Sequence, residues 1–269
     1  MKTVAEVIGV SRSNLADRLQ KRCKKRIGRP PLPDEELVSK IKAVIAELAT
    51  YGYRRVHAVL KRQALAAGLK PPNHKRVYRV MKVHGLLLDR HAGGVERRHD
   101  GRIAVDERNR RWCSDGFEIG CDNGERVRVA FALDCCDREA MSVLATTGGI
   151  AGEDVRDLMV AAVEYRFGQV NRSPVTIEWL SDNGSCYVAG DTRSFARERT
   201  TPLESPQSNG SEAFVRTIKR DYVRVSPRPD AKTVMPQLPA WIAHYNQVHP
   251  HKALGYRSPR EFIAAHARP

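Results

Sequence analysis

The sequence predicts an α/β domain, with a mixed sheet flanked by helices, that follows a purely helical N-terminal part. Residues 112–119 are expected to form a first strand, and Asp122-Asn123-Gly124 is a hairpin turn signal. After it, Val127, Val129, Phe131 and Leu133 alternate along a second strand. An apolar stripe at helical spacing follows over 155–167, and a further apolar run lies at 175–180. Before residue 90 the apolar residues recur at helical spacing, so that part is expected to be helical.

The net charge of +15 is concentrated at one end of the chain. Residues 1–111 contain 27 Lys and Arg against 11 Asp and Glu, whereas residues 112–269 contain 19 against 20. A basic segment joined to a near-neutral one is typical of proteins that bind nucleic acid. The six cysteines show no CxxC spacing, which argues against a zinc site, and no apolar run of 18 residues is present. We therefore expect a cytoplasmic protein with no membrane partner.

Residues 1–28 have the spacing of a helix-turn-helix. Ala5, Gly9 and Leu15 match the small residue, the turn glycine and the apolar residue of that motif, whose second helix enters the major groove of DNA. An ordinary helical hairpin is the alternative. Because the first helix starts at the very beginning of the chain, we expect preceding sequence to come from elsewhere, as a fusion with an upstream reading frame.

The second of these helices carries the first candidate DNA-binding residues. Ser11 is expected to cap it, with Leu15 and Leu19 facing inward. The outward-facing candidates are Arg12, Asn14 and Arg18.

A second helical DNA-binding unit is predicted over residues 34–90. Leu37, Ile41 and Val44 form one apolar stripe, and Asn73 is expected to cap a later helix. The outer face of that later helix carries three basic residues that would contact DNA, and they are Lys75, Arg76 and Arg79. Residues 91–110 are polar and basic and are interpreted as a linker to the domain at 111–269.

Three acids stand where a catalytic site of an α/β domain is expected. Asp115 lies in the middle of the first strand, and Asp182 directly follows the fourth strand, at the edge where such sheets bind ligands. Glu212 opens a helix that follows a turn rich in Pro, Ser, Asn and Gly. Neighbouring carboxylates repel one another, and divalent cations relieve that repulsion. Each acid alone has a structural alternative, and Asp134 is a second candidate for the position of Asp115.

The helix that begins near Glu212 has two different faces. Phe214, Ile218 and Tyr222 share the apolar one. Arg216 and Lys219 lie on the same face as Glu212, so they are candidates for binding DNA beside the acids. A solvated ion pair is the structural alternative.

Several motifs together resemble the DDE catalytic core of bacterial insertion-sequence transposases, in particular the second-reading-frame products whose cores are like retroviral integrase. The motifs are Arg111-Trp112-Cys113-Ser114-Asp115, Leu180-Ser181-Asp182-Asn183-Gly184-Ser185, Ser205-Pro206-Gln207-Ser208-Asn209-Gly210 before Glu212, Tyr51-Gly52-Tyr53-Arg54-Arg55, and the tail with His244-Tyr245-Asn246, His249-Pro250-His251 and Leu254-Gly255-Tyr256-Arg257-Ser258-Pro259.

The resemblance implies an RNase H-like core preceded by all-α helix-turn-helix units. It also implies a two-metal site at Asp115, Asp182 and Glu212 that uses Mg²⁺, or Mn²⁺ as a substitute, to cleave double-stranded DNA at the element's ends and to join the 3′-OH to target DNA. Lys219 corresponds to the basic residue that such enzymes use against terminal DNA. A homodimer or larger assembly on DNA and association with the nucleoid are further expectations.

One spacing departs from the family pattern. Asp182 and Glu212 are separated by 29 residues, which is shorter than usual, and Thr200-Thr201-Pro202-Leu203 stands where a further strand is expected. A site that works by positioning is sensitive to small displacements of its acids. The alternative function is therefore a catalytically impaired, transposase-derived DNA-binding protein or repressor.

Overall fold

The computed structural model describes residues 2–19, 32–89, 105–170, 172–181, 192, 194–195, 203–204 and 209–266. The chain divides into two compact units, residues 1–36 and residues 37–269. Residues 20–31 and the greater part of the predicted linker, 90–104, lie outside the described residues.

The first unit contains two short helices, α1 (Lys2–Val7) and α2 (Arg12–Leu19). Ser11 caps α2 as predicted, since its Oγ accepts a hydrogen bond from the backbone N of Asn14 at 3.2 Å. Ala5 is buried, but Leu19 is 67% exposed, so the expectation that it faces inward is wrong. The six residues of α1 span only about 9 Å and cannot cover the far end of α2.

The second unit begins with three helices, α3 (Glu35–Glu47), α4 (Tyr53–Ala66) and α5 (His74–Val83). Asn73 caps α5 as predicted, because its side chain accepts from the backbone N of Lys75 at 2.9 Å. The apolar stripes of the three helices meet in one small core, which contains Leu37, Ile41, Val44, Tyr51, Val56, Val59, Leu60, Val77, Val80 and Met81.

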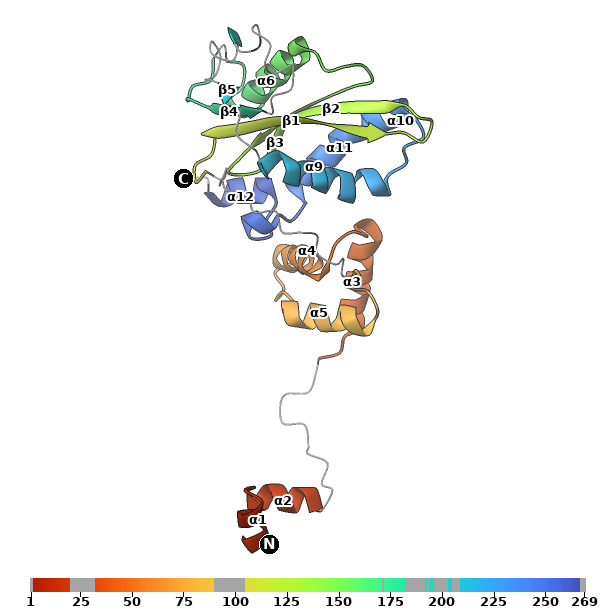
Figure 1. Ribbon diagram of the computed structural model, residues 1–269, viewed down its shortest axis with the longest axis vertical. Coiled ribbons are helices and arrows are strands. Elements are labelled where there is room, and N and C mark those ends of the chain that lie inside the picture. The colour runs from red at the N-terminus through yellow and green to blue at the C-terminus, as the bar shows by residue number, and fades with distance from the viewer. Residues whose placement is uncertain are drawn as a thin grey trace. The chain divides into compact units, whose positions relative to one another are not determined.

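A five-stranded mixed sheet follows, in the order β3-β2-β1-β4-β5 (Figure 1). Its strands are β1 (Arg111–Gly120), β2 (Arg126–Asp134), β3 (Ala140–Thr146), β4 (Glu178–Ser181) and β5 (Leu203–Glu204). The first three strands are antiparallel to one another, and β4 is parallel to β1 and to β5. The mixed sheet that the sequence predicts is confirmed.

Two strands differ from expectation. The fourth strand begins at Glu178 and not at Val175. Glu178 pairs with Arg111, the first residue of β1, so the residues before Glu178 have no strand residue of β1 to pair with. The strand expected to be lost near residue 203 is present, although it has only two residues. It pairs with Trp179 and Leu180 of β4.

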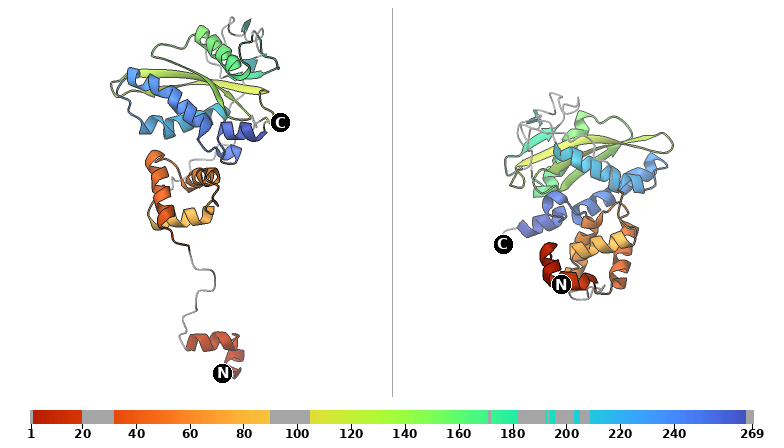
Figure 2. Two further views of the ribbon diagram at one scale, coloured as in Figure 1. Left: turned by 180° about the vertical axis from the view of Figure 1, so that it is seen from behind. Right: turned by 60° about the horizontal axis from the view of Figure 1, so that its bottom comes forward.

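Helices cover both faces of the sheet. On one face α6 (Gly152–Phe167) packs on Trp112, Ala130 and Trp179. On the other face α9 (Asn209–Asp221) and α11 (Leu238–Gln247) pack over β1, β2 and β3, as Figures 1 and 2 show. Shorter elements complete the chain, namely η1 (Val223–Val225), α10 (Ala231–Val234), η2 (Met235–Gln237), η3 (Lys252–Leu254) and α12 (Pro259–His266).

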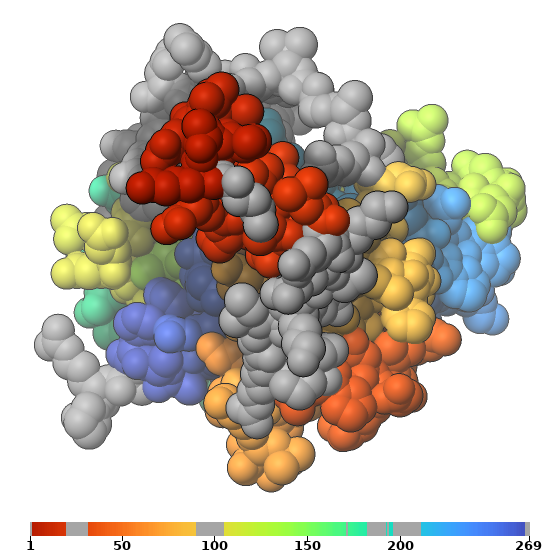
Figure 3. All heavy atoms as spheres, turned by 90° about the horizontal axis from the view of Figure 1, so that it is seen from below, coloured from red at the N-terminus to blue at the C-terminus, as the bar shows by residue number. Residues whose placement is uncertain are grey.

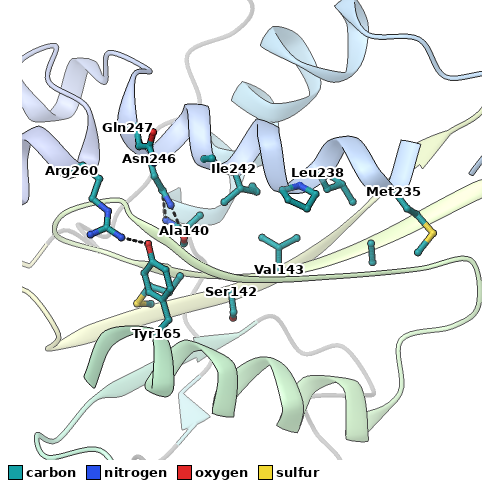
Figure 4. A pocket seen from close by; sticks show the side chains of 14 residues that line it. Ala140, Ser142, Val143, Tyr165, Met235, Leu238, Ile242, Asn246, Gln247 and Arg260 are labelled. Atoms are coloured by element: carbon teal, nitrogen blue, oxygen red, sulfur yellow. Dashed lines mark hydrogen bonds between the residues drawn. The ribbon is translucent and has the colours of Figure 1, made fainter. Parts of the chain in front are cut away.

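A polar clamp joins α11 to the edge strand β3. The side-chain amide of Asn246 is buried. Its Nδ2 donates to the carbonyl of Ala140 at 2.8 Å, and its Oδ1 accepts from the backbone N of Ala140 at 2.9 Å (Figure 4). A cavity of about 540 Å³ lies beside this clamp, between β3, α6 and α11. None of the described helices is both long and apolar enough to cross a membrane.

Contacts across the second unit connect α4 and the residue Tyr51 before it to α9 and the C-terminal part of the chain. The hydroxyl of Tyr51 is 2.9 Å from Nδ1 of His249, and Arg55 donates to Asp221 at 3.0 Å. Arg62 donates to the carbonyl of Val248 at 2.9 Å and forms an ion pair with Glu261. These interactions fix the tail against α4.

Two histidines in this region are expected to make the fold sensitive to acid. Burial lowers the pKa of His249 far below its usual 6.5 and, with nearby Arg55, lowers that of His251 to about 3. Both are neutral in the folded chain, but the unfolded chain binds protons below about pH 6.5, so stability falls as the pH falls. In urea titrations these two side chains should contribute a loss of up to roughly 2.7 kcal/mol per pH unit between about pH 6 and pH 5.

The His251→Gln variant provides the control for this prediction. It removes one of these two side chains and should lower the slope of stability against pH by up to roughly 1.4 kcal/mol per pH unit. Equal stability of the wild-type chain at the two ends of this pH range would contradict the prediction.

Candidate active site

Asp115 lies in the middle of β1, on the face that carries α9. Side chains two residues apart share a face of a strand, and its neighbours Cys113 and Phe117 are buried in the cluster that contains Phe214. Asp115 is half-buried, and its Oδ1 accepts a hydrogen bond from the backbone N of Gly116 at 2.8 Å. A carboxylate therefore interrupts the apolar surface of this strand.

Glu212 lies in the first turn of α9 and is exposed. Two residues later, the buried ring of Phe214 packs on Phe131 with 4.3 Å between ring centroids. Phe131 is the direct cross-strand partner of Asp115. The start of α9 is thus anchored beside the strand position of Asp115, which brings these two predicted acids to one region.

Asp182 lies outside the described residues. It directly follows Ser181, the last residue of β4, and Ser181 pairs with Ser114, the residue directly before Asp115. The two acids thus follow partner residues on adjacent parallel strands. Within the part of the chain that the structure describes, no group of three or more His, Cys, Asp or Glu forms a metal-binding cluster.

Asp134, the second candidate for the first acid, serves a structural role. It is fully buried, and its carboxylate accepts hydrogen bonds from Trp112 Nε1 at 3.1 Å and from three backbone N–H groups, those of residues 109, 136 and 137. Burial and the charge of Asp137 raise its pKa, while Arg166 lies 3.6 Å away. A carboxylate with all these partners holds the turn after β2 and is not open to a ligand.

Arg166 is a residue that sequence reasoning missed. Its side chain is 5% exposed and pairs with Asp137 at 3.1 Å and Glu139 at 3.0 Å, in addition to Asp134. In the sequence it is an ordinary base in the last turn of a helix, and no local signal distinguishes it.

The predicted DNA-binding residues lie on exposed helix faces. Arg216 and Lys219 are exposed on α9, and Nζ of Lys219 is 5.7 Å from the ring centroid of Phe117. The α5 candidates Lys75 and Arg79 are exposed, and Arg76 is half-buried. In α2, Arg12 and Arg18 are exposed and Asn14 is half-buried. These positions suit contact with DNA, and their roles stay predictions.

Family models match most of the chain. A model described as an integrase core domain matches residues 105–203, and a second model with that description matches residues 197–259. A model described as an HTH-like domain matches residues 33–92.

Individual relatives agree with these matches. The Escherichia coli transposase InsD for insertion element IS2A/D/F/H/I/K is 54% identical over 243 residues, which cover 87% of this chain and 80% of the relative. The transposase InsD for insertion element IS2-9, from Escherichia coli strain K12, is also 54% identical, covering 87% and 78%.

Solved structures also resemble this chain. A simian T-cell lymphotropic virus intasome in complex with the PP2A regulatory subunit B56 gamma has a TM-score of 0.49 at 12% identity, covering 86% of this chain and 75% of that one. The HTLV-2 integrase catalytic core in complex with magnesium has a TM-score of 0.42 at 12% identity, covering 57% and 94%. The sequence matches, by contrast, are close and span the helical region, the sheet and α9. This chain belongs to the insertion-sequence transposases with a retroviral-integrase-like core, DNA-binding polynucleotidyl transferases of the DDE class with an RNase H-like fold.

Proposed function

We propose that Asp115, Asp182 and Glu212 form the catalytic trio and hold two divalent cations, Mg²⁺ or Mn²⁺, while the enzyme cleaves and joins DNA at the element's ends. The observation that carries this proposal is the strand register. Asp115 and Asp182 follow the paired residues Ser114 and Ser181, and Phe131, the partner of Asp115, packs on Phe214 close to Glu212.

The side chains at these positions fit such ions. Asp115 and Glu212 offer only oxygen donors, which Mg²⁺ and Mn²⁺ prefer. Asp115 is half-buried and Glu212 is exposed, so both are accessible, unlike the enclosed Asp134. Bound cations would stabilise charge on the attacking and leaving oxygens of a phosphodiester. The hydrogen bond from Gly116 orients Asp115, and the aromatic contact of Phe214 fixes the first turns of α9.

The reaction would proceed in two displacements at phosphorus. A water oxygen first forms a bond to the phosphorus at the element's end as the bond to the 3′ oxygen breaks, and that oxygen takes a proton and becomes a free 3′-OH. The 3′-OH then attacks a target phosphodiester and displaces another 3′ oxygen. The joining step breaks one phosphodiester and forms another. It therefore needs no nucleotide cofactor as a source of energy.

DNA would be held by faces of helices that precede the linker in the sequence and of one helix that follows it. Arg12, Asn14 and Arg18 of α2 and Lys75, Arg76 and Arg79 of α5 are assigned to groove or backbone contacts, and Arg216 and Lys219 to DNA beside the acids. This assignment keeps the domain division 1–28, 34–90, 91–110 and 111–269. Bringing two ends together would need at least a dimer, and an upstream-frame protein is a further proposed partner. If sedimentation showed one protomer in the complex with two element ends, the dimer would be excluded.

Strand transfer is the experiment that tests this function. The purified chain would be mixed with labelled duplexes that carry the element's own ends, together with plasmid target. We expect joined products with Mg²⁺ or Mn²⁺, their loss when EDTA is added, and their return when the metal is restored in excess. Bound DNA without any cleavage in either metal would rule out the proposed activity for this chain.

A further inference from the structure

A basic cavity of about 650 Å³ lies between α4 and the C-terminal tail, and neither Asp115 nor Glu212 lines it. One wall is a single face of α4, the second is the start of α5, and the third is the turn before α12. Figure 3 shows the tail, in deep blue, beside orange atoms of the helical region. The lining residues are Arg54, His57, Ala58, Lys61, Arg62, Leu65, His74, Gly255, Tyr256, Arg257 and Glu261.

The lining has an excess of positive charge. Its one carboxylate, Glu261, is already paired with Arg62, which also donates to the carbonyl of Val248 at 2.9 Å. Arg54, Lys61 and Arg257 are exposed, and none of the ion pairs among the described residues includes them. Arg54 also donates to the hydroxyl of Tyr53 at 3.1 Å, a neutral partner that does not compensate its charge. The cavity therefore carries an excess of positive charge that an anion would balance.

The tail contributes an aromatic side chain through an unusual turn. Gly255 and Tyr256 both have left-handed backbones, with φ of +66° and +65°, a region that residues other than glycine seldom adopt. Two backbone hydrogen bonds hold the turn. Tyr256 N donates to the carbonyl of His251 at 2.7 Å, and His251 N donates to the carbonyl of Arg257 at 3.0 Å. The turn places Tyr256 and Arg257 opposite α4 in the cavity wall.

The spacing of the charges suits a chain of phosphates better than a single small anion. Arg54 and Lys61 are seven residues apart on α4, which at about 1.5 Å per residue is roughly 10 Å. One strand of DNA advances about 3.4 Å along the helix axis per phosphate, so this span corresponds to about three nucleotides. His74 joins the cavity to the start of α5, whose outer face carries Lys75 and Arg79.

We propose that this cavity binds the sugar-phosphate backbone of double-stranded DNA, and that the C-terminal tail is thereby part of the DNA-binding surface. The proposal rests on the proposed DNA-binding role of α5, because the same duplex would lie along both. Arg54, Lys61 and Arg257 contact phosphates, and Arg62 acts as a positioning residue that holds the tail to α4. These contacts carry no sequence information, since they involve the backbone alone.

The test is the salt dependence of DNA binding by the full chain in EDTA, where no strand transfer occurs. The probe is a duplex of about 30 base pairs of unrelated sequence, and each phosphate contact contributes about 0.9 to the slope of log Kobs against log salt. The triple variant Arg54→Ala, Lys61→Ala, Arg257→Ala should lose roughly 2 to 3 from this slope. The matched control removes three exposed cations elsewhere, with Lys42→Ala, Arg172→Ala and Lys232→Ala.

The proposal is supported if the slope of log Kobs against log salt falls more in the cavity variant than in the control variant. Equal slopes in the two variants overturn it, whether or not the enzyme transfers strands, so the two proposals fail separately. A cross-linking measurement covers the case in which the triple variant does not fold. Benzoylphenylalanine at position 256 should cross-link to the duplex under near-ultraviolet light, and the absence of any adduct on a chain that binds DNA also overturns the proposal.

Discussion

The variants Asp115→Asn and Glu212→Gln are each expected to lower strand transfer by on the order of a thousandfold or more, with little change in DNA binding. Each substitution keeps the size of the side chain and removes the negative charge that a divalent cation needs. Asp115 is half-buried and Glu212 is exposed, so neither change disturbs the core. Time courses of joined product, with DNA binding measured in parallel, give both quantities.

Two matched substitutions make this prediction specific. Glu118→Gln, on the same strand, removes an exposed carboxylate that pairs with Arg126 and Arg128 and should leave the rate almost unchanged. Asp134→Asn tests the other acid and should act through stability, because Asp134 is buried among hydrogen-bond donors. If Asp134→Asn abolished transfer in a fully folded chain while Asp115→Asn did not, the assignment of the first acid would be wrong.

Arg166→Met is expected to destabilise the core by about 3–5 kcal/mol. Arg166 is the buried cation shared by Asp134, Asp137 and Glu139, and removing it leaves buried carboxylates with less compensation. Burial already raises the pKa of Glu139, and Arg166 opposes that effect. The free energy of unfolding in urea measures the loss.

Arg128→Met is the control for this substitution. Its side chain is 36% exposed and pairs with Glu118 at 2.9 Å on the surface of the sheet, so its removal should cost less than about 1 kcal/mol. Similar losses for both variants would show that the buried cluster adds nothing beyond a surface ion pair.

The local patterns predicted most of the helices and strands correctly. Alternation along 127–133 and the Asp122-Asn123-Gly124 turn indicate the β1–β2 hairpin, and Gly168 ends α6 with φ of +80°. These features depend on neighbouring residues, so they are visible in the sequence. The late start of β4 and the two-residue β5 depend on where partner strands begin, which no local pattern contains.

The candidate site was predictable in a similar, partial way. The sequence singles out Asp115 and Asp134 as rivals, since both are carboxylates in strands. Their roles differ because Asp134 meets Trp112 and three backbone N–H groups in the folded chain, whereas Asp115 lies across from Phe131 and near the start of α9. Such contacts between distant residues require the folded arrangement. The basic cavity is another example, because α4 and Arg257 are far apart in the chain.

The contacts between the α4 region and the C-terminal tail also set an order of events during synthesis. Arg62 and Glu261 are 199 residues apart, and Tyr51 and His249 are 198 apart. At about 5–20 residues per second, a ribosome needs roughly 10–40 s to make the tail after it has made α4. Throughout that interval the cavity lacks its third wall. With the DNA-binding role proposed for this cavity, a nascent chain would hold DNA less firmly than the finished protein, which would delay full engagement with the element until the tail is translated.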